Sequence, residues 1–487
     1  MSLRGSFVVG AATRSYRITS PFPSRVQSRS SQWSAQTKVL SFEHCPTRCS
    51  SSSSASSASR SSVSSSSTYI NPGHQDRPLI VLGLESSCDD SSCSIVTSTR
   101  EILSLQTISQ HTLNSSYGGV HPLAAQIAHS ANIPRAIERC LAEAGIGWGE
   151  IDAVAYTRGP GMKGCLGVGE MAAKGLASGL GKRLVGIHHM QAHALTPLLT
   201  ESDPPQFPFL ILLVSGGHTQ LVLAEAVDKF KILLDTLDSK VGDAFEKSAR
   251  LLSLPPHPSR SPGSILEHYA SLPTLPPYNN DDENTTASRR GLPIPLSMNE
   301  GAKRLAFSFA GLLSALERQL ELDSKAPSSS TSSPSSTTPS TAVTNSKMSS
   351  KPHPTPLSTI TEAQQRHFSR LFQNAATKHI VLKLTQAIEA LNPALCQSLD
   401  GLVVSGGVAS NLYLRGELEK MVGRTNLNVK EGRGMRLFYP PIALCTDNAA
   451  MIAWTAILRM QAGLESDPYD LPLRPKWSLD DLYDDVP

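Results

Sequence analysis

The chain has 487 residues and a net charge of +3 at pH 7, and hydrophobic side chains make up 39% of it. That length is enough for two or three domains, and no apolar run reaches the roughly 18 residues that a membrane span needs. Seven arginines, one lysine and one glutamate give the first 75 residues a charge of +7, which leaves −4 for the rest. A mildly acidic body excludes general nucleic-acid binding, so any RNA contact depends on a local basic patch.

The N-terminal segment has the composition of an organelle-targeting sequence. Its first 75 residues are rich in arginine and serine, contain Glu43 as their single acid, and include a serine tract from Ser50 to Ser67. We therefore predict that residues 1–76 comprise a mitochondrial or chloroplast transit peptide and a disordered spacer. A plain disordered tail is the alternative.

Residues 79–84 form a continuous apolar run that predicts a buried strand. A polar loop at residues 85–90 follows, and residues 94–97 predict the returning strand. Asp89 and Asp90 suit a phosphate that is carried with a metal ion, although acidic hairpin tips are often only solvated turns. Further along, the pattern predicts a strand at 151–156 and helices at 122–144 and 163–180.

Three histidines follow the next apolar run, residues 184–187, within six positions: His188, His189 and His193. His189 and His193 are spaced i, i+4, so on a helix they share one face. Two imidazoles at that spacing can bind one cation. The alternative is that they are packing or surface residues, since short motifs often match by chance.

The stretch from 209 to 223 predicts two strands joined by the tight turn Ser215–Thr219. Its two glycines, with serine and threonine beside them, can point backbone N–H groups at an anion, which makes this the strongest local signal for phosphate binding. A glycine hairpin without a ligand is the alternative. Helical patterns follow at residues 241–252, 303–320 and 361–391, separated by proline-rich loops at 254–262 and 273–295. A Ser/Thr/Pro tract predicts a disordered insertion at 324–358.

A strand at 402–405 runs into Gly406-Gly407 and then a helix that continues through Met421. A strand, a glycine turn and a helix form a nucleotide-site layout, in which Asn411 can bond a ribose or a base edge. Near the C-terminus, Asp447 precedes a helix at 449–459. From its position alone, the interpretation of Asp447 as the helix N-cap is favoured.

Taken together, eight motifs in this order resemble the tRNA adenosine threonylcarbamoyltransferases over about residues 78–475, insertions excepted. They are Gly83-Leu-Glu-Ser-Ser-Cys-Asp-Asp90, Thr157-x-Gly-Pro-Gly161, His188-His-Met-x-x-His193, Leu213-Val-Ser-Gly-Gly-His-Thr219, Gly242-Asp-Ala-Phe-Glu-Lys247, Phe307-Ser-Phe-x-Gly311, Gly406-Gly-Val-x-x-Asn411 and Cys445-Thr-Asp-Asn448. A smaller set of residues resembles the mitochondrial branch of the family: Pro122, Ala125, Gln126 and His129.

The resemblance implies an α/β fold of the actin/Hsp70/sugar-kinase type, with two lobes around a nucleotide cleft. The first lobe would span residues 77–208 with 442–480 returning to it, and the second would span 209–441. The resemblance also implies transfer of threonylcarbamoyl from threonylcarbamoyl-AMP to the N6 amine of the adenosine next to the anticodon of ANN-decoding mitochondrial tRNAs, with release of AMP. The partners would be tRNA and a second copy of the chain, in the mitochondrial matrix and without a membrane.

Residue by residue, the resemblance implies that His189, His193 and Asp447 bind one divalent metal ion, Fe or Zn. The adenylate would contact the following residues: Leu213, Val214, Ser215, Gly216, Gly217, Glu246, Gly263 and Asn411. The sequence departs from the family at two of these positions. Glu246 stands where the family has Asp, and Gly263 lies in Ser261-Pro-Gly-Ser264 instead of Pro-Gly-Gly-Pro.

An adenine amine is a poor nucleophile, so positioning it against an activated carbonyl carries much of the expected rate. No residue stands out as a general base, and Asp90 and His218 are the candidates. A metallopeptidase is one alternative, but the chain lacks a His-Glu-x-x-His helix. The others are a sugar or acetate kinase on the same fold, because fold does not fix function, and an RNA-binding scaffold without catalytic activity.

Overall fold

The computed structural model describes residues 77–117, 119–257, 260–278, 291–296, 301, 303–325, 360–424 and 434–485. The expected transit peptide and spacer at residues 1–76 lie outside these ranges. The expected insertion at 324–358 also lies outside them, apart from its first two residues, which end a helix. Among the described residues, no helix combines the length and the apolar character that crossing a membrane requires.

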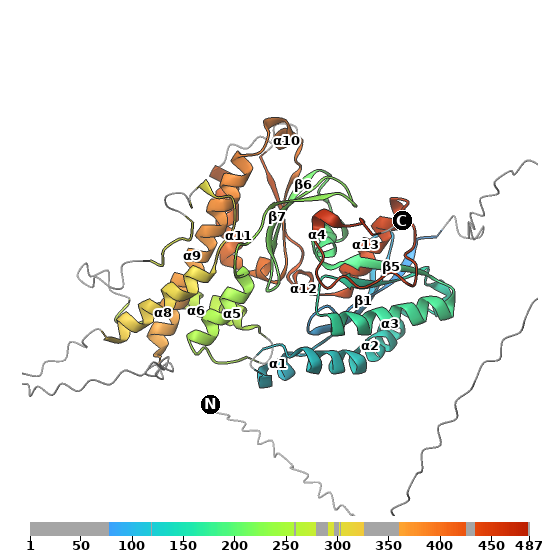
Figure 1. Cartoon of the computed structure of the whole chain (residues 1–487), viewed down its shortest axis with the longest axis horizontal. Helices are drawn as coiled ribbons and strands as arrows, with labels where there is room; N and C mark the ends of the chain where they lie inside the picture. Colours follow the sequence, from blue (N-terminus) through green and yellow to red (C-terminus); the bar gives the residue numbers. More distant parts are fainter. Residues whose placement is uncertain are drawn as a thin grey trace, which may run out of the picture. The chain divides into compact units, whose positions relative to one another are not determined.

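Ten strands in the described part of the chain form two sheets of the same topology (Figure 1). The first sheet has the order β3-β2-β1-β4-β5 and the second has the order β10-β9-β6-β7-β8. In each, three strands form an antiparallel meander and two more continue from the first strand in parallel. The strands are β1 (Ile80–Glu85), β2 (Asp90–Thr97), β3 (Ile102–Ser109), β4 (Ala153–Gly159), β5 (Arg183–His188), β6 (Phe209–Val214), β7 (Thr219–Ala224), β8 (Phe230–Leu234), β9 (Gly401–Ser405) and β10 (Arg436–Phe438).

Helices cover both faces of the first sheet, because successive side chains of a strand point to opposite faces. Leu82 and Leu84 of β1 pack against α2 (Pro122–Ala144) and α3 (Lys163–Leu180). Val81, on the opposite face, packs with α13 (Ala449–Gln461). Gly83 makes that second contact close: a Cβ there would lie 2.5 Å from the carbonyl oxygen of Ala449. The start of α13 is therefore held directly against β1.

The second sheet is covered on one face by α5 (Val241–Leu251), α6 (Pro262–Ser271), α8 (Ala310–Lys325), α9 (Glu362–Glu389) and α11 (Leu412–Arg424). The other face is closed by α4 (His189–Thr200) and by the C-terminal residues Trp477, Leu479 and Leu482. The remaining short elements are α1 (His111–Tyr117), α10 (Pro393–Ser398), α12 (Ile442–Cys445), η1 (Trp148–Glu150), η2 (Gly407–Ser410) and η4 (Leu479–Asp481).

Helix α4 (His189–Thr200) is packed on two sides (Figure 1). Ala192 and Leu199 belong to the cluster of the first sheet. Met190, Ala194 and Leu195 belong to the cluster of the second. The helix that carries the two i, i+4 histidines therefore lies between the sheets, where its ends and rotation are fixed by packing on both sides.

These sheets and their helices confirm the expected α/β fold of the actin/Hsp70/sugar-kinase type. The helices predicted at 122–144 and 163–180 are confirmed as α2 and α3. The predicted start of the helix at residue 303 is wrong, because α8 begins at Ala310. The elements that were not predicted include β3, β8, α1, α6, α10 and α12.

Candidate functional site

His188 ends β5 and caps the helix that follows it. Its Nδ1 accepts hydrogen bonds from the backbone N–H groups of Met190 at 3.1 Å and Gln191 at 3.3 Å. Since Nδ1 is an acceptor, Nε2 carries the proton and donates it to the carbonyl of Trp477 at 3.2 Å. Burial lowers the pKa of His188 well below its usual value. The first histidine of the motif is thus a neutral helix cap, a role that the sequence analysis did not identify.

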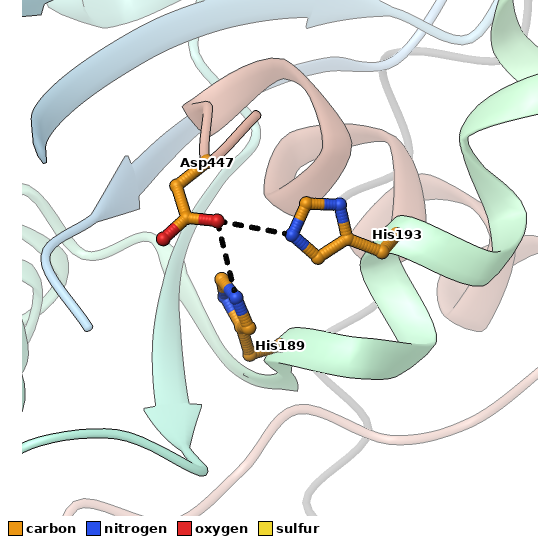
Figure 2. Close-up of side chains that lie close together, drawn as sticks. All are labelled: His189, His193 and Asp447. Carbon is orange, nitrogen blue, oxygen red and sulfur yellow. Dashed lines mark hydrogen bonds and ion pairs between the residues drawn. The ribbon is translucent and has the colours of Figure 1, made fainter. Parts of the chain in front are cut away.

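His189 and His193 project from consecutive turns of α4 toward Asp447 (Figure 2). Oδ1 of Asp447 lies 3.1 Å from Nε2 of His193 and 3.4 Å from Nε2 of His189. One ligand atom from each residue falls within 4.8 Å of the others, and these residues are the group with metal-ligand spacing found in the described part of the chain. The structure therefore brings together all three expected ligands and contains a candidate metal site.

Asp447 is not the N-cap of α13, so the interpretation favoured from its position alone is wrong. Asn448 has that role, because its side chain accepts a hydrogen bond from the N–H of Met451 at 3.1 Å. The cap leaves the carboxylate of Asp447, between α12 and α13, in contact with the histidines. The Asp447 side chain is 28% exposed, against 9% for His189 and 1% for His193. The group is thus open on the side of Asp447.

His189 lies between two carboxylates, Asp447 and Glu85. Burial opposes protonation of His189, but Glu85 and Asp447 outweigh it and raise its pKa well above the usual value. Burial would likewise raise the pKa of both carboxyl groups, yet the neighbouring His189 keeps them low. His193 differs, because burial lowers its pKa and favours the neutral ring that a metal ligand needs.

The donor set fits a divalent cation. Two imidazole nitrogens and one carboxylate oxygen converge, and Zn and Fe both accept that combination. Two carboxylates, those of Glu85 and Asp447, lie in the same buried group and can balance the charge of such an ion. The residues present are therefore suited to hold the metal that the sequence analysis expected.

The turn between β6 and β7 lies beside this group. Burial, and then the nearby His189 and His193, lower the pKa of His218 to about 3. Within the turn, Oγ of Ser215 accepts hydrogen bonds from the N–H groups of Gly217 at 3.2 Å and His218 at 3.0 Å. The N–H group of Gly217, one of the groups expected to face an anion, is therefore engaged by Ser215.

Two glycines bring the neighbouring segments onto the same turn. A Cβ on Gly242, at the start of α5, would lie 2.6 Å from the nitrogen of Gly216. Gly406, after β9, has a φ of +98°, and a Cβ there would lie 2.5 Å from the carbonyl oxygen of Val214. The β6–β7 turn, the start of α5 and the β9–η2 turn thus meet, as the expected adenylate contacts require.

The other residues expected to contact the adenylate are Glu246, Gly263 and Asn411. Glu246 lies one turn after Gly242 on α5, with its side chain 41% exposed and 3.8 Å from Arg250. Gly263 is in the first turn of α6, next to Phe245. Asn411 is buried, accepts from the N–H of Leu414 at 2.9 Å and donates to Gln373 at 3.1 Å. Its side chain caps α11, which leaves one amide hydrogen for a ligand.

Asp89 and Asp90 end the turn between β1 and β2. Asp89 accepts a hydrogen bond from Asn114 at 2.6 Å. Burial, followed by the carboxylates of Asp89 and Asp447, raises the pKa of Asp90 to about 7. Oδ1 of Asp90 is buried without a hydrogen-bond partner among the described residues. Of the two candidate bases, Asp90 rather than His218 therefore has a pKa near neutrality.

The sequence is similar to a family with an assigned activity. The family model of the tRNA N6-adenosine threonylcarbamoyltransferase TsaD matches residues 101–454. A probable mitochondrial tRNA N6-adenosine threonylcarbamoyltransferase of Arabidopsis thaliana is 34% identical, over 85% of this chain and 77% of that protein. A tRNA N6-adenosine threonylcarbamoyltransferase of Cereibacter sphaeroides strain KD131 is 36% identical, over 83% of this chain and 95% of that protein.

Another relative, from Albidiferax ferrireducens, is 35% identical over 82% of this chain and 98% of its own length. Among solved structures, component A of (R)-2-hydroxyglutaryl-CoA dehydratase from Acidaminococcus fermentans matches with a TM-score of 0.42 and 12% identity, over 79% of this chain and 99% of that one. The sequence matches confirm the resemblance noted from the eight motifs. The chain belongs to the tRNA N6-adenosine threonylcarbamoyltransferase family and is an enzyme, a transferase that modifies tRNA.

Proposed function

We propose that the protein transfers threonylcarbamoyl from threonylcarbamoyl-AMP to the N6 amine of the adenosine next to the anticodon, in ANN-decoding mitochondrial tRNAs, and releases AMP. The observation that carries this proposal is the arrangement of His189, His193 and Asp447 beside the β6–β7 turn. A metal-ligand group next to a glycine turn suits a substrate with both phosphate and carbonyl oxygens. Neither the metallopeptidase nor the kinase alternative accounts for the family match over residues 101–454.

In this proposal His189, His193 and Asp447 hold one Fe or Zn ion. A bound ion supplies Lewis acidity, which polarises a carbonyl or phosphoryl oxygen. The adenylate lies against Leu213–Gly217, with Gly263 beside them and Asn411 contributing its remaining amide hydrogen. Glu246 accepts hydrogen bonds from the ribose hydroxyls, for which its partly exposed carboxylate is accessible.

Asp90 is the proton acceptor that we propose for the attacking adenosine amine. A general base works best when its pKa lies near the working pH, and that of Asp90 is raised to about 7. Its unpartnered Oδ1 can accept the proton that the amine loses as the new N–C bond forms. His218, with a pKa of about 3, remains neutral and is suited to donate a hydrogen bond to the substrate.

The proposed location is the mitochondrial matrix. The relative from Arabidopsis thaliana is described as mitochondrial, and the first 75 residues here have the charge and composition of a transit peptide. N-terminal sequencing of protein purified from mitochondria is expected to give a start between about residue 35 and residue 76. An intact Met1 on the mitochondrial protein would contradict import with cleavage.

The proposed assembly is a homodimer formed through α2 and α3. Leu123, Ile127 and Met171 on these helices are 59%, 63% and 67% exposed. A groove of about 740 Å³ runs beside them, and residues of both helices line it, among them Gln126, Gly167 and Met171. Two copies can bury this face against itself, as a two-fold interface requires. Light scattering should report a dimer for the wild type and a monomer for Met171→Glu, whereas Leu322→Glu on α8 should leave the dimer intact.

Nucleoside mass spectrometry of mitochondrial tRNA tests the function in cells. Cells that lack the protein are expected to lose threonylcarbamoyladenosine from mitochondrial ANN-decoding tRNAs and to recover it with the wild-type chain. Recovery with His193→Ala would argue against the proposed site. Unchanged modification in cells lacking the protein would argue against the proposed substrate.

A further inference from the structure

The carboxylate of Glu85 is buried and contacts His189 through Nδ1, the ring nitrogen on the other side of the ring from Asp447. Glu85 ends β1 and is 0% exposed. Its Oε1 accepts a hydrogen bond from the N–H of Ser87 at 2.6 Å. Its Oε2 accepts one from the hydroxyl of Thr157 at 2.6 Å and lies 3.0 Å from Nδ1 of His189. Burying a carboxylate is expensive unless its oxygens are paired in this way.

We propose that Glu85 is a positioning residue, which fixes the ring of His189 and adds negative charge for the bound cation. The inference rests on the proposed function, in which His189 is a metal ligand. A carboxylate can only accept, so the ring nitrogen that faces Glu85, Nδ1, carries a proton. That tautomer leaves the lone pair of Nε2 for the cation, on the side of Asp447, which lies 3.4 Å from Nε2.

The carboxylate of Glu85 is itself held by two neighbouring segments. Thr157 belongs to β4, which pairs in parallel with both β1 and β5. Because carboxyl ends of parallel strands meet at one edge of a sheet, Glu85, Thr157 and His188 are brought together there. The N–H of Ser87, in the turn after β1, holds the other oxygen. Glu85 therefore has little freedom to follow a displaced His189.

The second histidine has no comparable support. Nδ1 of His193 is buried and makes no hydrogen bond within the described residues. The ring of His189, in contrast, has a second polar neighbour besides Glu85, because the hydroxyl Oγ of Ser87 lies 3.4 Å from its Nδ1. His189 is therefore the oriented ligand of the pair. Histidine ligands commonly depend on such a partner on their other nitrogen, and loss of that partner weakens metal affinity by roughly 10–100-fold.

Charge and orientation make separate contributions that three substitutions distinguish. Glu85→Gln keeps the size and an acceptor for Nδ1–H, but removes the negative charge. Glu85→Ala removes both the charge and the acceptor. Thr157→Val keeps the charge but removes one of the hydrogen bonds that fix the carboxylate. As a matched control, Glu143→Gln makes the same substitution at an exposed carboxylate of the first lobe that bonds Ser104 and Gln106.

Zn²⁺ affinity measures the effect directly, with metal-free, full-length protein and a chelating indicator as competitor. We expect Glu85→Gln and Thr157→Val to bind Zn²⁺ about 10-fold more weakly than the wild type, and Glu85→Ala about 100-fold more weakly. Glu143→Gln should match the wild type. Circular dichroism verifies the fold, and if Glu85→Ala fails to fold, the isosteric Glu85→Gln variant decides. Folded Glu85→Gln with an affinity within threefold of the wild type would overturn the proposal.

A His193→Ala variant separates this inference from the proposed function. If the wild type binds Zn²⁺ no more tightly than His193→Ala, the metal site is wrong and both proposals fail. If His193→Ala weakens binding but the Glu85 variants do not, the metal site stands and Glu85 is only a buried structural carboxylate. Weaker Zn²⁺ binding both in His193→Ala and in the Glu85 variants supports the role of Glu85.

Discussion

Two pairs of adjacent residues, His188-His189 and Asp447-Asn448, divide their tasks within the site. His188 and Asn448 are caps of α4 and α13. His189 and Asp447, each next to a cap, face the common point that His193 completes. Capping fixes the first turn of each helix and so determines where the neighbouring ligand points.

Asp447→Ala and Asn448→Ala are predicted to fail in different ways. Asp447→Ala removes a ligand oxygen, so elemental analysis of the purified protein should find little metal. Asn448→Ala removes the cap of α13, which should lower the free energy of unfolding by about 0.5–2 kcal/mol while most metal is retained. Full metal occupancy in Asp447→Ala would return that residue to a structural role.

Asp90→Asn is predicted to stabilise the metal-free protein and to inactivate the enzyme. The pKa of Asp90 is raised to about 7, against about 4 in an unfolded chain. Between those values the folded state binds more protons, so this group's contribution to stability falls as pH rises through that window. The advantage of Asp90→Asn in melting temperature should therefore grow from pH 5 to pH 8.

The transfer activity should show the opposite pH dependence, because it depends on the same carboxyl group. As a base, Asp90 acts in its ionised form, so the transfer rate of the wild type should rise with pH up to about 7. The transfer rate of Asp90→Asn should be about 10²–10⁴-fold lower than that of the wild type. An Asp90→Asn enzyme with normal turnover would leave the reaction without an assigned base.

Substitutions of Glu246 test the departure from the family pattern at this position, where the family has Asp. We predict that Glu246→Asp keeps the affinity for AMP within a few-fold, whereas Glu246→Ala loses charge-assisted hydrogen bonds worth about 1.5–3 kcal/mol each. Asp243→Ala, on the same helix and paired with Lys247, is the matched control. Titration calorimetry with AMP measures all three, and normal affinity in Glu246→Ala would remove the residue from the site.

At the scale of helices and strands, the long and strongly patterned elements could be predicted from the sequence. Helices α2 and α3 begin and end at the predicted residues. The missed strands β3 and β8 have weak patterns, because most of their side chains are not buried. The start of α8 depends on Asp238, which accepts the N–H groups of Phe309 and Ala310 from about seventy positions away. No local pattern encodes such a cap.

At the site, the i, i+4 spacing indicated His189 and His193 as possible metal ligands, but Asp447 was predicted only through the resemblance to a family. His189 and His193 are neighbours on one helix, but Asp447 is some 250 positions away and joins them through the packing of α13 against β1 and α4. The role of Glu85 was missed because its partner, His189, is 104 positions away in the sequence, whereas Asn448 caps α13 through the local N–H of Met451 and was passed over in favour of its neighbour Asp447. For Glu85, the available signal was an acidic residue directly after a buried apolar strand.

Gly83 is the residue on which the contact of α13 with β1 depends. Because a Cβ would lie 2.5 Å from the Ala449 oxygen, Gly83→Ala should displace α13 and cost about 1–3 kcal/mol in urea unfolding. Asp447 should move with the helix and metal content should fall. Gly175→Ala, on α3 with open space around the glycine, should instead stabilise the protein by about 0.5–1 kcal/mol. Equal stability of the two variants would contradict the close packing.

At the scale of the whole described chain, one topology is used twice. Each sheet has a hairpin at the end of its first strand, and the two turns are residues 86–89 and 215–218. Glu85 and Asp90 flank the first turn, and the second turn lies beside the histidines of α4. Since α4 packs on both sheets, substrate contacts made by the second sheet can be aligned with ligands held by the first.

Reconstitution of the transfer reaction tests the central claim most directly. Purified, metal-loaded protein is incubated with threonylcarbamoyl-AMP and an unmodified ANN-decoding tRNA, and the digested nucleosides are measured by mass spectrometry. We predict threonylcarbamoyladenosine beside the anticodon and AMP in equal amount, and neither product above background with His189→Ala, His193→Ala or Asp447→Ala. Unmodified tRNA after incubation with folded, metal-loaded wild-type protein, or full transfer by the metal-free variants, would contradict the account.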